Sequence, residues 1–228
     1  MFSPSITIDH VLPWGRSFDE YVRMFNLEEV ELAGRILSCA DGPAAFNAEM
    51  NRRGRRVVSA DPIYVFAADE IRSRISAAKD LIVANTSAHM ESYRWDEIES
   101  LDELVRVRME AMAVFLGDFA AGCADGRYCV DSLPQLAFRD KQFDLCLCSH
   151  FLFTYSTQLD RAFHAQAIAE MRRVAHEVRV FPLLDMDGAP SSHVEWVRNA
   201  LDEMGFDTRV ARVPYEYQKG GHSMLVVS

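Results

Sequence analysis

The residues that could support chemistry most directly are a small-residue turn and an acid that follows it along the chain. Asp41-Gly42-Pro43 interrupts a short apolar run, and Asp61 ends the next β-branched run about 20 residues later. A turn of small residues lets the backbone approach a ligand, and the start of the following helix offers free N–H groups to a negatively charged group. At this spacing a carboxylate accepts hydrogen bonds from a ribose diol. The pair predicts a nucleotide-type cofactor, for which a dinucleotide and S-adenosylmethionine serve equally.

A strand, a tight turn and a helix are needed to position these residues. The apolar run 36–39 is long enough for a buried strand and too short for a helix. Gly42 and Pro43 break the run, and a helical pattern then extends from Ala44 to Gly54. In open α/β sheets such a turn lies at the carboxyl ends of the strands, where nucleotides bind. An ordinary strand-to-helix connection without a ligand explains this stretch equally well when it is taken alone.

Several stretches of the sequence resemble the motifs of class I S-adenosylmethionine-dependent methyltransferases. Residues 36–44, which read Ile-Leu-Ser-Cys-Ala-Asp-Gly-Pro-Ala, resemble motif I, and residues 57–62 resemble motif II. Asp131-Ser132 and the run 136–150 resemble motifs III and IV. The resemblance covers residues 35–228 and is closest to a little-characterised bacterial subgroup with the Asp-Gly-Pro-Ala turn and the Ser-His-Phe-Leu-Phe run.

The match departs from the family pattern at three positions within motif I. Ala40 and Ala44 stand where glycines are usual, and Ser38 stands where an acid is usual. Alanine is the mildest replacement for glycine if φ stays negative, so cofactor binding is expected to be weakened rather than lost. The absence of an acid at Ser38 puts one indirect contact to the cofactor's amino group in doubt.

The resemblance implies how the first half of S-adenosylmethionine is bound. Ala40, Asp41 and Gly42 should line its methionine moiety. Asp61 should accept hydrogen bonds from both ribose hydroxyls. A surface acid that merely ends a strand is the alternative interpretation of Asp61.

The resemblance also implies the adenine and sulfonium contacts. Pro62 and Ile63 should flank the adenine. Asp131 should accept a hydrogen bond from the adenine amino group, and the backbone N–H of Ser132 should donate to a ring nitrogen. Ser149 should lie at the mouth of its strand, next to the sulfonium. The register before Asp131 is harder to fix than the register of the other motifs, because a long insertion precedes it.

Methyl transfer needs little acid–base catalysis when the acceptor is already nucleophilic, because in-line positioning supplies most of the acceleration. A hydroxyl acceptor usually needs a base, whereas a carboxylate needs none. His150 is the best candidate for a base, since imidazole titrates near neutrality; a histidine that is hydrogen-bonded at a strand end is an equally good interpretation. Tyr155 is a candidate for orienting the acceptor, as are Tyr215 and Tyr217, although aromatic residues there also suit a cavity wall or the core.

The chain as a whole predicts an α/β fold: a three-layer, doubly wound, seven-stranded methyltransferase sheet with a C-terminal antiparallel hairpin and a helical insertion or cap. Further strand patterns lie at 128–131, 143–149 and 178–182. The β-rich runs 208–217 and 224–227 flank a turn-like segment, which predicts the hairpin. A Rossmann dehydrogenase keeps alternating strands and helices to its end. The hairpin, and a turn that lacks the G-x-G-x-x-G set, therefore favour the methyltransferase interpretation.

Two segments are expected to flank this domain and its cofactor site. Residues 1–34 predict an N-terminal helical lid segment, with Trp14, Arg16 and Tyr21 as candidates for covering the cofactor and the substrate, and residues 35–228 predict the methyltransferase-like domain. Packing and solvation are the ordinary roles of a Trp and an Arg at such positions.

The block at about 63–125 is too long for one strand-to-strand crossover and predicts a helical insertion beside the cavity. We expect a helix over 63–78 and a polar loop over 85–93. A strongly periodic helix should then begin after the capping box at Ser100 and stop near Gly122.

Composition limits the classes of function. A chain of 228 residues, 49% hydrophobic and 25% charged, suits one domain with a sizeable core. A net charge of −10 argues against a surface that tracks phosphates, so we expect no nucleic-acid partner and rank RNA modification below small-molecule modification. Five cysteines form no even disulfide framework, and Cys146-x-Cys148 lacks zinc spacing, so no metal is expected. Neither a leader pattern nor a membrane-spanning stretch stands out, which predicts a cytoplasmic protein without a membrane partner.

Three functions stay open on the sequence. The leading one is a methyltransferase that uses S-adenosylmethionine on a small-molecule acceptor, whose accepting atom (oxygen, nitrogen or sulfur) is undetermined. The second is a non-catalytic regulatory protein that binds S-adenosylmethionine or S-adenosylhomocysteine, which the altered turn at Ala40 and Ala44 suggests. The third is a nicotinamide-dependent oxidoreductase, which the hairpin and the missing glycines disfavour. A monomer and a homodimer are both compatible with the sequence.

Overall fold

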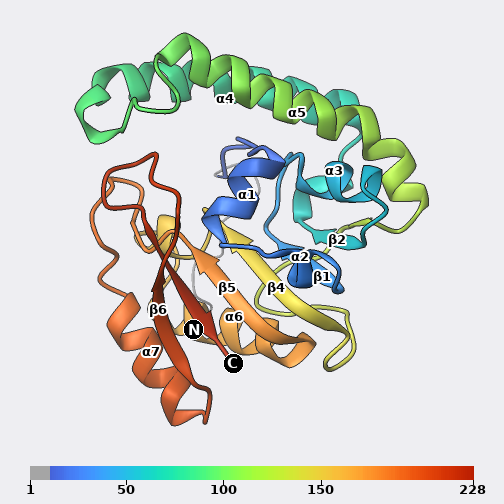
Figure 1. Cartoon of the computed structure of the whole chain (residues 1–228), viewed down its shortest axis with the longest axis vertical. Helices are drawn as coiled ribbons and strands as arrows, with labels where there is room; N and C mark the ends of the chain where they lie inside the picture. Colours follow the sequence, from blue (N-terminus) through green and yellow to red (C-terminus); the bar gives the residue numbers. More distant parts are fainter. Residues whose placement is uncertain (1–10) are drawn as a thin grey trace.

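The structure is a computed structural model that describes residues 11–228. Its strands form one seven-stranded sheet in the order β3-β2-β1-β4-β5-β7-β6 (Figure 1). β7 runs opposite to the other six strands and pairs antiparallel with both β5 and β6. The strands are β1 (Ile36–Cys39), β2 (Val57–Ala60), β3 (Tyr128–Cys129), β4 (Phe143–Ser149), β5 (Ala175–Phe181), β6 (Thr208–Arg212) and β7 (Ser223–Val227).

Helices cover both faces of this sheet, which makes three layers. The first apolar core cluster joins α6 and α7 to one face, and the second joins α1, α2 and α3 to the other. The helices are α1 (Phe18–Met24), α2 (Glu29–Leu32), α3 (Phe46–Arg52), α4 (Ala68–Ala88), α5 (Leu101–Ala124), α6 (Arg161–Val174) and α7 (Val194–Glu203). The expected α/β class, with its mixed seven-stranded sheet and terminal antiparallel hairpin, is confirmed.

The central strands end level with one another, and this alignment builds the carboxyl edge of the sheet. Cys39 of β1 pairs with Ala60 of β2 on one side and with Cys148 of β4 on the other. The strands are apolar on both faces, as buried parallel strands are. The chain therefore turns away from the sheet at one level in all three strands, and the residues that follow each strand come together there.

The inserted helices α4 and α5 lie side by side across the top of the molecule in Figure 1, outside the three layers. A third apolar cluster joins both of them to β3 and to the 3₁₀ turn Pro62–Val65. The helix predicted over 63–78 is wrong at both ends. The carboxylate of Asp61 accepts a hydrogen bond from Ile63 N–H and starts the 3₁₀ turn, so the helix itself begins only at Ala68.

The same helix continues through residues 79–88, so the polar loop predicted over 85–93 is wrong for residues 85–88. Ile71, Ile75, Ala78 and Thr86 are buried at helical spacing, and α4 packs along α5. Packing on one side is enough to keep a polar sequence helical, because tertiary contacts readily outweigh small differences in helix propensity.

Three predicted strands differ in length from those of the structure. The strand expected over 128–131 ends at Cys129, and the strand expected over 178–182 starts earlier, because Ala175 pairs with Phe143 of β4. The run 208–217 leaves the sheet after Arg212, where pairing with β7 ends at Ser223. The chain between β6 and β7 is thus a long loop rather than a tight turn, and part of it reaches the candidate site.

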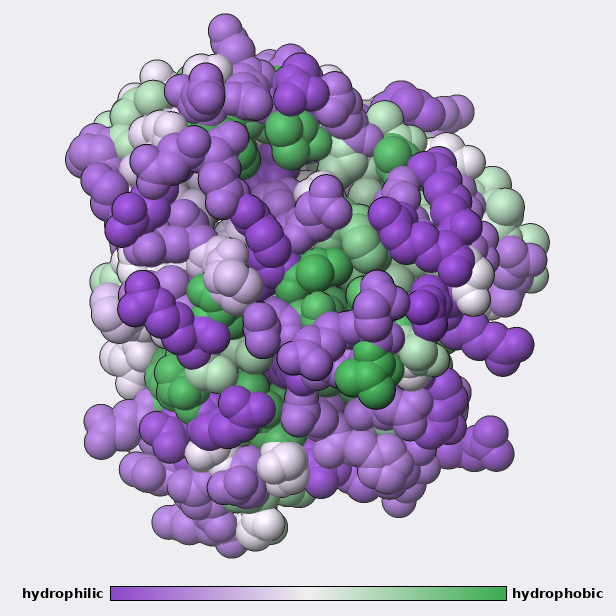
Figure 2. Space-filling view, viewed as in Figure 1, coloured by the Kyte–Doolittle hydropathy of each residue, from purple (hydrophilic) through white to green (hydrophobic). Residues whose placement is uncertain are grey.

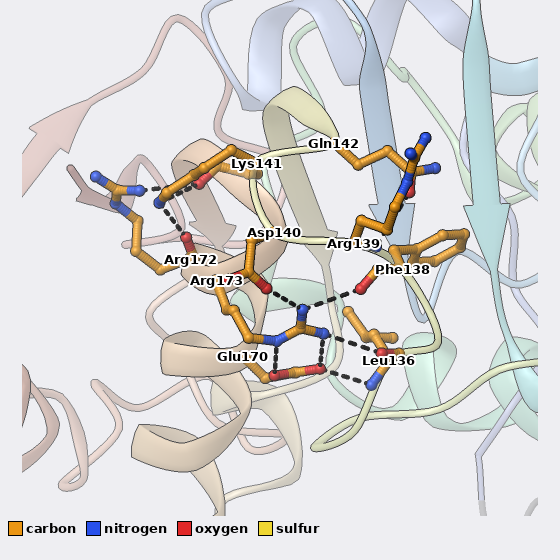
Figure 3. Close-up of polar contacts among 10 residues, drawn as sticks. Leu136, Phe138, Arg139, Asp140, Lys141, Gln142, Glu170, Arg172 and Arg173 are labelled. Carbon is orange, nitrogen blue, oxygen red and sulfur yellow. Dashed lines mark hydrogen bonds and ion pairs between the residues drawn. The ribbon is translucent and has the colours of Figure 1, made fainter.

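The amino edge of the sheet is closed by a network around Arg173, the penultimate residue of α6 (Figure 3). Its Nε and Nη2 donate to the two carboxylate oxygens of Glu170 at 2.8 and 2.7 Å. The remaining N–H groups donate to the Asp140 carboxylate and to the carbonyls of Phe138 and Leu136. This network fixes the loop that leads into β4, because every donor of the guanidinium has a partner.

The face of the molecule seen in Figure 2 is mainly hydrophilic, and its apolar side chains are in small groups separated by polar ones. Broad exposed apolar patches are typical of docking surfaces. This view of the described chain shows none of them. No helix among residues 11–228 is both long and apolar enough to cross a membrane.

Candidate active site

A cavity of about 470 Å³ opens at the carboxyl edge of the sheet. Its size lies in the range of small-molecule sites. Besides sheet residues it is lined by the arm 11–16, by α4 and α5, and by the loops after β5 and β6. The predicted site residues that line it are Ala40, Asp41, Gly42, Asp61, Ile63, Ser149, His150 and Tyr155.

Asp61 and Gly42 meet at the centre of this edge. The Gly42 N–H donates to Asp61 Oδ2 at 2.9 Å, and the Ile63 N–H donates to Oδ1 at 2.8 Å. Burial raises the pKa of Asp61 to about 6, although both N–H groups favour the charged carboxylate. Each carboxylate oxygen keeps a free lone pair, so the group can still accept from two hydroxyls.

The Gly42 backbone has a conformation that suits glycine. Its φ is +55°, and a Cβ at this position would have no heavy atom within 4 Å. Its carbonyl accepts from the Tyr64 hydroxyl at 2.8 Å, so the turn is held on its N–H and on its C=O. The space in front of the turn is therefore open to a ligand rather than filled by the protein.

Ala40 does not meet the condition under which alanine was expected to replace glycine easily. Its φ is +52°, in the left-handed region, where a Cβ costs roughly 1–2 kcal/mol. The condition of a negative φ is not met, because the chain must turn sharply here while its N–H still donates to the Ala60 carbonyl at 2.9 Å. Ala40 thus has the positive φ that glycine usually adopts, and the folded protein tolerates the free-energy cost of its Cβ.

The Asp41 side chain is buried beneath the turn, where three hydroxyls satisfy it. Tyr21 and Ser38 donate to its Oδ1 at 2.5 Å each, and Ser59 donates to Oδ2 at 2.6 Å. Burial raises the pKa of Asp41, and these three hydrogen bonds oppose that rise. A carboxylate is thus present beside Ser38, where the family pattern places an acid, but it comes from the turn instead of the strand.

His150 lies on the other side of the cavity, at the end of β4. Its φ is +52°, a strained value of the kind found at functional sites. Its Nδ1 is 2.8 Å from the Ser149 hydroxyl, and its ring packs edge-on against Phe181 at 5.4 Å. Burial and the charges of Arg16 and Arg108 lower the pKa of His150 well below its usual value. The imidazole is therefore neutral near pH 7, as a base must be.

The three tyrosines proposed to orient an acceptor all line the cavity but differ in their partners. The Tyr155 hydroxyl accepts from the Leu12 N–H at 3.2 Å, and the Tyr215 hydroxyl donates to Glu20 Oε1 at 2.8 Å. The buried hydroxyl of Tyr217 has no hydrogen-bond partner among the described residues. Tyr155 and Tyr215 thus help to build the wall, and Tyr217 has a free polar group.

Three of the predicted adenine contacts lie outside this cavity: Pro62, Asp131 and Ser132. The Asp131 carboxylate accepts from the N–H groups of Ser132 and Ala137, both in its own loop, at 2.9 and 2.8 Å. The structure does not bring them together with Gly42 and Asp61 in one cavity, so their roles stay predictions. Pro62 has a local function, because it opens the 3₁₀ turn that presents Ile63 to the cavity.

The arm before α1 crosses directly over the turn. The Ala45 N–H donates to the Arg16 carbonyl at 2.9 Å, and a Cβ on Gly15 would lie 2.0 Å from the Pro43 carbonyl oxygen. Only a glycine allows this approach. The lid candidates Trp14, Arg16 and Tyr21 all line the cavity.

Sequence reasoning missed Glu20 and Arg108, which form a buried ion pair between α1 and α5. Burial opposes ionisation of Glu20, but the charge and hydrogen bond of Arg108 outweigh it and hold the Glu20 pKa at about 2. Arg108 stands four residues after Leu104 and four before Met112, both buried. An isolated arginine in the apolar stripe of a helix was the sequence feature that could have revealed it.

The described residues include no group of three or more His, Cys, Asp and Glu side chains arranged to hold a metal ion. The cysteines of the described chain are all free thiols. The polar side chains that line the cavity instead carry carboxylates, amides, hydroxyls, an imidazole and two guanidiniums.

Comparison with known proteins identifies a relative of similar length. A Methanocaldococcus jannaschii protein, uncharacterized protein MJ0045, is 32% identical over 214 residues, which make up 93% of this chain and 94% of that protein. The chain belongs to the same protein family as MJ0045. No protein-family model matches it. This relative is archaeal, so membership of a bacterial subgroup stays a prediction.

Structurally similar proteins among the solved structures include methyltransferases. A SAM-dependent methyltransferase from Aquifex aeolicus is 15% identical, with 97% of this chain and 92% of that chain covered and a TM-score of 0.42. A TehB-like SAM-dependent methyltransferase from Corynebacterium glutamicum is 11% identical, with coverages of 86% and 79% and a TM-score of 0.42. The fold assignment rests on the strand order and the hairpin, not on these scores.

Proposed function

We propose that the protein is an S-adenosylmethionine-dependent methyltransferase that acts on a small molecule. The observation that carries this proposal is the contact between Gly42 and Asp61 at the carboxyl edge of the sheet. There a glycine turn with open space before it is joined to a carboxylate that ends the next strand. The same cavity contains the neutral imidazole of His150, so a cofactor half and an acceptor half lie in one space.

The residues present fit this cofactor. The Asp61 carboxylate retains acceptor capacity for the two ribose hydroxyls, and the apolar Ile63 side chain beside it suits one face of the adenine. Gly42 leaves room for the methionine moiety to pass close to the backbone. Asp41 would support the turn from below instead of touching the ligand, because its carboxylate is taken up by three hydroxyls.

The acceptor half contributes positioning and a base. When bound, S-adenosylmethionine supplies an activated methyl group. His150 would accept the proton of an acceptor hydroxyl as the methyl carbon bonds to that oxygen, and S-adenosylhomocysteine would leave. The Ser149 hydroxyl, 2.8 Å from Nδ1, holds the imidazole in orientation. A positioned base accelerates such a step by typically about 10²–10⁴-fold.

A small acceptor is supported by the cavity walls. The arm 11–16, α4, α5 and two loops surround the cavity, and its whole volume of about 470 Å³, cofactor half included, suits small ligands. A binding protein without catalysis is the alternative, and a nicotinamide-dependent enzyme is a third possibility that the hairpin disfavours.

Calorimetric titration with S-adenosylmethionine, S-adenosylhomocysteine and NAD tests the proposal. We expect both adenosyl compounds to bind and NAD not to bind. Tight binding of NAD alone would contradict the proposal. Transfer of a labelled methyl group to a set of small metabolites then separates the enzyme from the non-catalytic binder, since the binder would take up the cofactor and transfer nothing.

A further inference from the structure

Residues that line the cavity contain several buried polar atoms without a hydrogen-bond partner in the described part of the chain. They are Arg16 Nε, Arg108 Nε, Thr154 Oγ1 and Tyr217 Oη, and all four residues line the cavity. An unsatisfied buried polar group costs about 1–3 kcal/mol. Four of them around one space indicate that their partners come from the molecule that fills it.

The charges in this wall do not balance. The Arg108 side chain is 1% exposed and forms an ion pair with Glu20, whose other carboxylate oxygen accepts from Tyr215. Among residues 11–228, no carboxylate forms an ion pair with Arg16, whose Nη1 donates to the Trp14 carbonyl at 2.6 Å. Glu20 thus balances the charge of Arg108 but not that of Arg16, which leaves one guanidinium without a counter-charge among the described ion pairs. A buried excess charge is unfavourable unless a counter-ion is bound.

These two guanidiniums line the same cavity as His150. Their charges also contribute to the lowered pKa of His150, which is in keeping with a place on the acceptor side. The carboxylates of the cofactor half, Asp41 and Asp61, are held by hydroxyls and by backbone N–H groups instead of by either arginine. Two acids of the rim, Asp185 and Asp187, also line the cavity. Asp185 accepts from the N–H groups of Asp187 and Ala189 in its own loop, and among the described residues neither acid forms an ion pair with Arg16 or Arg108.

We propose that the methyl acceptor carries a carboxylate or phosphate, and that Arg16 and Arg108 bind this group beside His150 while Tyr217 and Thr154 complete its hydrogen bonds. The planar fork of a guanidinium matches both anions. The anion is the anchor, and the methyl group goes to another atom nearer His150, since an anion held by two guanidiniums is a weak nucleophile. This inference rests on the proposed function for the identity of the ligand as acceptor, but the anion site can be measured by itself.

Inorganic phosphate is the probe. It is titrated at constant ionic strength into the protein saturated with S-adenosylhomocysteine, and binding is followed by the line width of its phosphorus resonance. We expect one site of millimolar affinity, weakened at least tenfold in Arg16→Gln. The matched control Arg106→Gln, an exposed position on the same helix as Arg108, should bind phosphate like the wild type. No binding up to about 50 mM phosphate, a concentration that would nearly saturate a site of millimolar Kd, would overturn the proposal. Equal binding in Arg16→Gln and the wild type would also overturn it.

A second variant removes the other guanidinium without leaving a buried carboxylate alone. Glu20→Gln combined with Arg108→Met should also weaken phosphate binding at least tenfold. If this double variant fails to fold, the result for Arg16→Gln is decisive, because that substitution breaks no ion pair between residues 11–228.

The anion could instead be the carboxylate of the cofactor. In that case S-adenosylhomocysteine would exclude phosphate, and Arg16→Gln would weaken S-adenosylhomocysteine but not 5′-methylthioadenosine, which lacks the carboxylate; either result overturns the acceptor proposal. If the wild type binds no S-adenosylhomocysteine, the proposed function fails, while phosphate binding to the ligand-free protein that depends on Arg16 still supports the anion site.

Discussion

Two arginine clusters at opposite edges of the sheet show how this chain separates structure from binding. At the amino edge, every N–H of Arg173 donates to a carboxylate or a carbonyl of the protein (Figure 3). At the carboxyl edge, Arg16 and Arg108 each have a buried Nε with no hydrogen-bond partner in the described chain. An arginine whose donors all have protein partners fixes a loop. An arginine with a donor left over is available to bind a ligand.

His164 and His150 differ in the same way, since the first has protein partners for both ring nitrogens and the second lies at the cavity. His164 is fully buried, and its two ring nitrogens lie 2.7 and 2.8 Å from the carbonyls of Asp160 and Leu152. His150 has one nitrogen beside Ser149, and its ring faces the cavity. Satisfied polar groups stabilise the fold, and incompletely satisfied ones mark where a ligand is expected.

The largest effect on the rate of methyl transfer should come from replacing His150, whose ring lines the cavity. We expect His150→Ala to lower kcat for methyl transfer by about 10²-fold or more, because the base is lost. Affinity for S-adenosylhomocysteine should stay within a few-fold of the wild type. A parallel loss of affinity and rate would instead make His150 part of the cofactor site, and an unchanged rate would mean that the acceptor needs no base.

Asp61 tests the cofactor half. Asp61→Ala should weaken S-adenosylhomocysteine by about 1.5–3 kcal/mol, since two hydrogen bonds to a charged acceptor are lost. Calorimetry measures the loss. The control Asp144→Ala removes a carboxylate at the amino edge that pairs with Arg35, and it should leave the affinity unchanged. Equal affinities in Asp61→Ala and the wild type would rule out the ribose contact.

The network around Arg173 should affect the stability of the fold and not the binding of the cofactor. Arg173→Met should lower the free energy of unfolding by about 1–3 kcal/mol, because Glu170, Asp140 and two carbonyls lose their guanidinium donors. Affinity for S-adenosylhomocysteine should not change. Urea denaturation checks the first expectation, with Arg139→Met as control, since Arg139 is an exposed arginine of the same loop. If Arg173→Met lowered the binding free energy of S-adenosylhomocysteine by more than it lowered the free energy of unfolding, the amino edge would have to contribute to binding as well as to stability.

Asp61 also predicts a pH dependence. Its pKa of about 6 means that the carboxylate protonates below that pH, so affinity for S-adenosylhomocysteine should fall about tenfold between pH 7.5 and pH 5. Stability of the ligand-free protein should respond with the opposite sign. Ionising a group whose folded pKa is raised costs free energy, so the Asp61 contribution falls as pH rises from about 4 to about 6. Asp61→Asn should abolish both effects, and calorimetry at several pH values would detect a failure of either.

The smallest effect concerns the strained turn. Ala40→Gly should raise the free energy of unfolding by about 0.5 kcal/mol, because relief of the left-handed φ exceeds the greater entropy of glycine in the unfolded chain. Ala33→Gly, at a φ of −82°, should lower it. Thermal denaturation compares the two. A destabilised Ala40→Gly would show that the alanine methyl group contributes packing that outweighs its strain.

The sequence alone determined the features that depend on neighbours along the chain. Short apolar runs bounded by glycine, proline and acids predict β1, β2 and β4, because a buried strand needs only a few apolar residues and a breaker. The glycine turn and Asp61 followed from the same local pattern. The antiparallel ending was also predictable, since two β-rich runs close together pair as a hairpin.

Only the tertiary structure decided which distant side chains meet. Glu20, Arg108 and Tyr215 come from an early helix, an inserted helix and a late loop, and no spacing in the sequence relates them. The φ of Ala40 and the length of α4 were likewise set by pairing and packing with other elements. Local sequence fixes backbone preference, whereas partners of buried charges depend on how the insertion folds back over the sheet.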